Sequence, residues 1–102
     1  MSVELIGRVQ SSVPVTVVKN VFERIGLDPK YKILSDDGGA LRGQFRSFVH
    51  AAPEREDFEL AVSGTRVVLS CYSGTLREIE AAQRDVERFF ADEGLIVSLD
   101  EE

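Results

Sequence analysis

Two stretches of the chain alternate between apolar and polar residues on either side of a glycine-containing turn. Period-two alternation indicates half-buried strands, and a short glycine turn between two such strands indicates an antiparallel hairpin. In the second stretch, a two-residue turn at Ser63-Gly64 would place one apolar set on a single side of the sheet: Phe58, Leu60, Val62, Val67 and Leu69. This feature restricts the fold more than any other, because a hairpin needs further elements to cover its apolar face.

The first hairpin is expected within residues 31–49. Tyr31 and Ile33 should share a face with Gly43 and Phe45 if a three-residue loop, Asp37-Gly38-Gly39, connects the strands. A two-residue loop would instead pair Ile33 with Arg42 and turn an arginine toward the core, so the register favours the longer loop. Residues 50–57, between the hairpins, are charged and contain a proline, which is typical of a solvated loop.

A helix with clear start and stop signals follows the second hairpin. Thr75 and Glu78 form a capping box, and Gly94 suits a helix end. Its apolar positions recur at helical spacing: Leu76, Ile79, Ala82, Val86, Phe89 and Phe90. Residues 95–97 then predict a short final strand.

An earlier helix is predicted between Ser11-Ser12, as N-cap candidates, and Gly26, as a C-terminal glycine that Pro29 follows. Its apolar positions are Val17, Val18, Val21, Phe22 and Ile25. Leu27 should pack back on the last turn. Residues 3–10 before it alternate and predict the first strand, with Val3, Leu5 and Val9 on one side.

The predicted order is therefore strand, helix, four strands, helix and short strand. It indicates an α+β fold in which an antiparallel sheet of five to six strands carries both helices on one face. A chain of 102 residues has room for one hydrophobic core, so residues 1–102 should form a single domain.

The composition argues against several classes of protein. One cysteine and one histidine cannot supply a zinc site, and Cys71 continues the inward apolar series of its strand. His50 lies beside a loop without a nearby nucleophile. We expect no catalysis, no metal and no cofactor. The longest apolar runs are far shorter than a membrane span, so a cytoplasmic location is expected.

The candidate functional surface is the sheet face opposite the helices. This face is expected to hold five basic and two acidic side chains, although the chain as a whole carries a net charge of −6. The predicted binding residues are Arg8, Lys32, Arg42, Gln44, Arg46, Arg66, Val68 and Tyr72. They suggest docking of a protein partner or of a second copy in a dimer. The alternatives are nucleic-acid binding through the same face, a small-ligand carrier, and a face that is only solvated.

The second hairpin and the last helix carry a resemblance to a known family. Residues 63–73, then Ala82-Gln83-Arg84, Arg88-Phe89-Phe90 and Gly94-Leu95, resemble one repeat of the TATA-box-binding protein family. The resemblance covers residues 60–95 by motif and the rest by the order of elements, which is also that of helix-grip-like domains. It implies an open sheet face that binds nucleic acid or ligands.

Two positions depart from the pattern of that family. Ala61 stands where the family has a wedge phenylalanine, and Leu69 stands where it has a groove-reading threonine. The chain also holds one repeat rather than two, so a saddle would require two copies.

Overall fold

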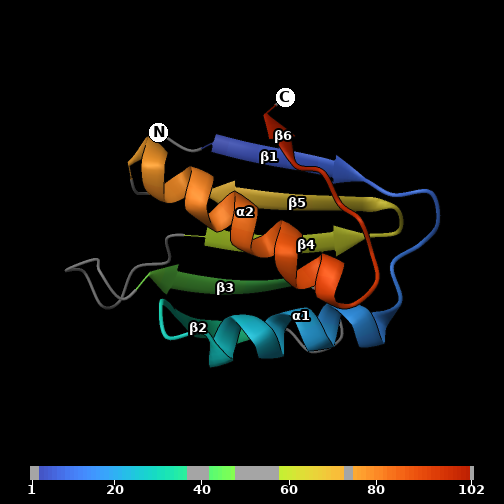
Figure 1. Ribbon diagram of the computed structural model, residues 1–102, viewed down its shortest axis with the longest axis horizontal. Coiled ribbons are helices and arrows are strands. Elements are labelled where there is room, and N and C mark those ends of the chain that lie inside the picture. The colour runs from blue at the N-terminus through green and yellow to red at the C-terminus, as the bar shows by residue number, and fades with distance from the viewer. Residues whose placement is uncertain (1–2, 37–41, 48–57, 73–74, 102) are drawn as a thin grey trace.

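In the described part of the chain, six antiparallel strands form one sheet in the order β2-β3-β4-β5-β1-β6, and two helices cross the same face of it (Figure 1). The computed structural model describes residues 3–36, 42–47, 58–72 and 75–101, of which 34–36, 42 and 44–47 are described by their backbone alone. The elements in chain order are β1 (Val3–Arg8), α1 (Val15–Leu27), β2 (Tyr31–Asp36), β3 (Arg42–Ser47), β4 (Phe58–Ser63), β5 (Arg66–Cys71), α2 (Leu76–Asp92) and β6 (Asp100–Glu101). The predicted α+β class is confirmed.

The core lies between the sheet and the helices. Leu60, Val67 and Leu69 from the sheet and Val21, Ile25 and Phe90 from the helices are completely buried. Alternation along the strands explains this, because successive side chains of a strand point to opposite faces. The predicted burial of Cys71 is also confirmed.

The second hairpin has the predicted faces but a different register. Its turn is Gly64-Thr65, since Ser63 is opposite Arg66 and Leu60 is opposite Leu69. Gly64 has φ +59°, a left-handed conformation that glycine adopts without strain. The prediction of a Ser63-Gly64 turn was wrong by one residue. The resulting shift of two positions in register keeps every side chain on its predicted face.

The first hairpin contains a bulge. Tyr31 is opposite Ser47 and Ile33 is opposite Phe45, but the register shifts before Ser35, and Asp36 is opposite Gly43. The predicted three-residue loop is therefore wrong in register, while residues 37–41 lie outside the described part. His50 and the predicted loop at 50–57 lie outside it too.

Gly43 is a point of close contact between the sheet and α1. A Cβ atom at this position would lie 2.5 Å from Cε1 and 2.8 Å from Cζ of the buried Phe22 ring. The absence of a side chain therefore lets the ring lie directly on the β3 backbone.

The ends of α1 differ from the prediction. Pro14 is the N-cap and provides no side-chain cap, so Ser11 and Ser12 do not cap the helix. The helix continues through Gly26 to Leu27, which is 84% exposed rather than packed on the last turn. It ends there because Asp28 precedes Pro29 and adopts extended geometry with ψ 126°.

The predicted start and end of α2 are confirmed. Thr75 Oγ1 accepts a hydrogen bond from the Glu78 backbone N–H at 3.2 Å, and Gly94 after the helix has φ +83°. Leu76, in contrast, is 72% exposed and does not join the core. The predicted strand at residues 95–97 is an irregular crossing segment, and the last strand is β6, paired with Leu5 and Ile6 of β1.

Candidate binding surface

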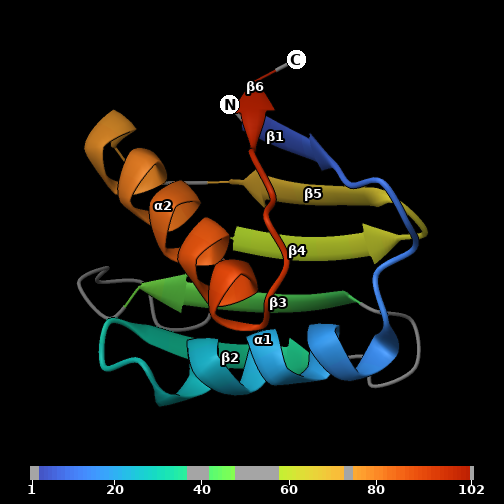
Figure 2. The same cartoon turned by 45° about the vertical axis from the view of Figure 1, so that its right-hand side comes forward.

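The sheet face opposite the helices carries an apolar row at its centre. Figure 2 shows both helices and the segment that leads to β6 on the other side of the sheet. Ile6 of β1 is opposite Val68 of β5, which is opposite Ala61 of β4. All three side chains are half-buried. The row thus offers a partner a continuous apolar strip across three strands.

Two pairs of basic residues flank this row. Arg8 is directly opposite Arg66, and Lys32 is directly opposite Arg46 in the register. Arg8, Lys32 and Arg66 are exposed, and none of the three has a carboxylate partner within the described residues. The centres of the two pairs are three strand spacings apart across the sheet, about 14 Å, and the pairs lie toward opposite ends of their strands.

The remaining predicted binding residues lie on the same sheet. Tyr72 is 36% exposed, and its hydroxyl donates to Glu59 Oε2 at 3.3 Å. Arg42 and Gln44 are known by backbone register alone, Arg42 opposite Ala61 and Gln44 opposite Glu59. The structure thus brings Arg8, Arg66 and Val68 together on β1 and β5, and it places Lys32 on β2, the edge strand at the other side of the sheet.

Two residues that strand alternation places on this side of the sheet are buried. Glu59 is only 5% exposed, and Ser70, directly opposite it, is 9% exposed. Strand alternation predicts which face a residue takes. Alternation does not predict whether neighbouring side chains cover a residue. The sequence therefore indicates that Glu59 points outward but not that it is buried.

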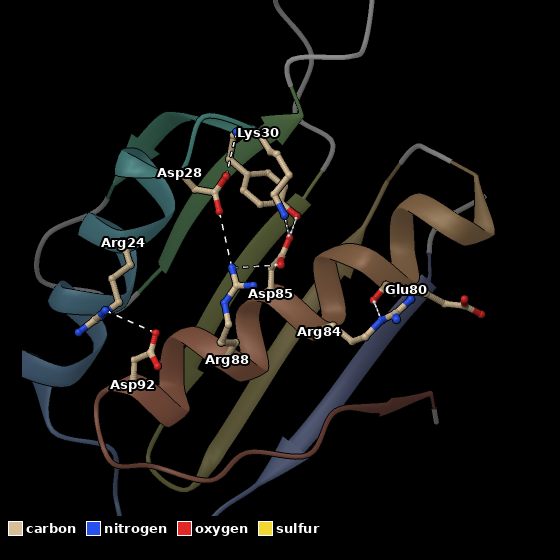
Figure 3. A network of polar contacts seen from close by, with 9 residues as sticks. Arg24, Asp28, Lys30, Glu80, Arg84, Asp85, Arg88 and Asp92 are labelled. Carbon is tan, nitrogen blue, oxygen red and sulfur yellow. Dashed lines mark hydrogen bonds and ion pairs between the residues drawn. The ribbon is translucent and has the colours of Figure 1, made fainter.

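The carboxylates of α2 are largely engaged inside the molecule (Figure 3). Asp85 is only 5% exposed. Its Oδ2 accepts from the Tyr31 hydroxyl at 2.6 Å and from Lys30 Nζ at 2.7 Å, and Arg88 lies 3.3 Å from its Oδ1. This cluster joins α2 to the start of β2.

A second polar cluster joins α2 to α1. Glu93 accepts from Arg24 Nε at 2.9 Å and Nη2 at 2.6 Å, and from the Asn20 amide at 2.7 Å. These hydrogen bonds from Asn20 and Arg24 hold the pKa of the Glu93 carboxyl below its usual value. Arg24 also lies 3.6 Å from Asp92. Because these acids have partners within the chain, α2 presents less uncompensated negative charge to solvent than its sequence suggests.

The pKa values of two buried groups rise because burial disfavours their charged forms. Burial raises the pKa of the Tyr31 phenol far above its ordinary value, and the hydrogen bond to Asp85 raises it further. Burial alone raises the pKa of the Cys71 thiol to about 11. A thiol with such a pKa is almost entirely protonated at neutral pH and is a poor nucleophile.

Within the described ranges, no group of three or more histidine, cysteine, aspartate or glutamate side chains could hold a metal ion. Neither described helix is long and apolar enough to cross a membrane. Comparisons with protein families, with curated proteins and with solved structures find no match to this chain.

Proposed function

We propose that the chain is a non-catalytic binding module whose open sheet face binds an acidic protein partner. Two pairs of basic residues carry this proposal. Arg8 is opposite Arg66 and Lys32 is opposite Arg46, and the two pairs lie on either side of the apolar row. Like charges directly opposite each other destabilise a sheet. The stability of the fold therefore does not account for these residues, whereas recognition of an acidic group does.

The apolar row favours a protein over other acidic ligands. Ile6, Val68 and Ala61 would be covered by an apolar partner surface, and interface cores are typically apolar with basic and aromatic residues around them. Arginine adds specificity, because its planar guanidinium can hold a carboxylate with two hydrogen bonds. With its single cysteine, such a module suits the cytoplasm.

Nucleic acid is the second candidate. The same basic pairs suit phosphate groups, and the resemblance of residues 60–95 to a TATA-box-binding protein repeat supports this class. Salt distinguishes the two candidates. The logarithm of the binding constant for duplex DNA falls linearly with the logarithm of the salt concentration, with a slope of about −0.9 for each phosphate contact. Burial of the apolar row is nearly insensitive to salt.

The test is a titration of isotope-labelled protein, followed by NMR, with a synthetic strand peptide of alternating Glu and Val. A 20-base-pair duplex serves as the competing probe. We expect the peptide to shift the resonances of Ile6, Arg66 and Val68, and to lose affinity with salt less steeply than the duplex does, because part of its binding comes from the apolar row. Shifts confined to other surfaces would refute the proposal. If only the duplex binds, and its affinity falls steeply with salt, then nucleic acid is the ligand instead of a protein.

Matched variants separate specific recognition from general charge. Replacing Arg8 and Arg66 with serine should weaken peptide binding several-fold without unfolding the protein, because exposed substitutions cost little stability. Replacing Arg77 and Arg84, exposed on α2, makes the same change in charge on the opposite side and should leave binding unchanged. Sedimentation of the protein alone shows whether a second copy is the partner instead.

A further inference from the structure

A crevice of about 240 Å³ lies on the other side of the sheet, between the first half of α2 and the strands β1 and β6. Its apolar walls come from Val3, Leu5, Ile79 and Leu99, and the exposed Leu76 extends them. Gln83, which also lines the crevice, donates to the Leu99 carbonyl at 2.5 Å and so fixes one wall. The crevice is independent of the surface proposed above.

Three carboxylates surround this apolar crevice. Glu80 of α2 and Asp100 and Glu101 of β6 line it, all three are exposed, and the described lining includes no basic residue. Arg84, one turn after Glu80 on α2, donates from its Nε to the Glu80 backbone carbonyl at 3.5 Å rather than to the carboxylate. In Figure 3 the Glu80 carboxylate extends away from that guanidinium. Among the described residues, no lysine or arginine side chain forms an ion pair with these three carboxylates.

The size and chemistry of the crevice define its ligand. Ligand pockets typically measure roughly 300–1,000 Å³, so this smaller space excludes a nucleotide or a molecule the size of a drug. Apolar walls favour an alkyl chain over a hydrated metal ion, and the carboxylates favour a positive charge at one end of that chain. We propose that the crevice binds a short primary alkylammonium, a free aliphatic amine of about five carbons.

The experiment compares three ligands of equal chain length: n-pentylammonium, n-pentanol and n-pentanoate. Each is titrated at constant ionic strength into isotope-labelled protein while the backbone amide resonances are followed by NMR. We expect pentylammonium to shift residues 76–83 and 99–101 with a millimolar dissociation constant, which is normal for so few atoms. Pentanol should bind several-fold more weakly and pentanoate should not bind.

Charge-matched variants locate the effect. Replacing Glu80 and Glu101 with glutamine should weaken amine binding about fivefold, because each exposed charge pair contributes little on its own. Replacing Glu4 and Glu23, which are exposed elsewhere, makes the same change in net charge and should leave binding unchanged. Equal weakening in both variants, or equal binding of all three ligands, would overturn the proposal. So would binding of Nα-acetyl-lysine amide without binding of pentylammonium, because the site would then belong to a partner's lysine.

Discussion

Replacing Tyr31 with phenylalanine tests the buried link between β2 and α2 most directly. The change removes one oxygen atom and leaves the ring, which is 6% exposed and packs edge-on against Phe58 at 6.3 Å between centroids. The lost interaction is the 2.6 Å hydrogen bond to Asp85, a carboxylate that is itself 5% exposed. No cavity larger than the oxygen atom is created.

The expected loss follows from the charge of the acceptor. A hydrogen bond to a charged group contributes about 1.5–3 kcal/mol, more than one between neutral groups. Lys30 and Arg88 still contact Asp85 in the variant, so we expect a loss of about 2 kcal/mol in the free energy of unfolding. For a domain of this size, that loss lowers the melting temperature by about 8–16 °C.

Urea unfolding of the parent and variant measures this loss, and Tyr72→Phe provides the control. The Tyr72 hydroxyl makes a longer bond, 3.3 Å to Glu59, at a more exposed position. We expect the control to lose less than half as much stability as Tyr31→Phe. Equal losses in both variants, or an unchanged midpoint for Tyr31→Phe, would show that the Tyr31–Asp85 bond does not stabilise the fold as argued.

Three further predictions concern buried residues of the sheet. Because the pKa of Tyr31 is higher in the folded than in the unfolded protein, stability should fall by about 1.4 kcal/mol per pH unit above pH 10, and alkaline urea titrations of Tyr31→Phe should not show this loss. Cys71, with a pKa of about 11, should react with a thiol reagent slowly when folded and quickly in urea; fast labelling of the native protein would contradict its burial. Gly43→Ala should cost about 1–3 kcal/mol by thermal unfolding, since the new Cβ meets the Phe22 ring, whereas an unchanged melting temperature would mean that the ring moves freely.

Much of the fold was predictable because short-range periodicity determines it. The apolar residues of β4, β5 and α2 repeat with the period of their element, so their buried faces follow from the sequence alone. The errors arise where periodicity carries no information. A hairpin shifted by two residues keeps the same faces, and the turn at Gly64-Thr65 was therefore missed by one residue.

The candidate site was predictable to a smaller extent. The alternation of residues along the strands correctly placed Arg8, Arg66 and Val68 on one face of the sheet. The burial of Asp85 could not be predicted, because its partner Tyr31 is 54 residues away and a single carboxylate among several on α2 gives no local signal. The sequence also gives no sign of the contact made by Glu87, whose carboxylate accepts from the Leu99 backbone N–H at 2.7 Å.

The two-residue length of β6 has a consequence for how the protein behaves at high concentration. A long exposed edge strand is a template on which other chains can add and aggregate, and natural proteins protect such edges with short strands, charges or bulges. Here Asp100 and Glu101 end the sheet with two acidic residues beside β1, while β2 at the opposite edge contains a bulge. Both edges therefore resist lateral growth into fibrils, so association through the open face need not lead to aggregation.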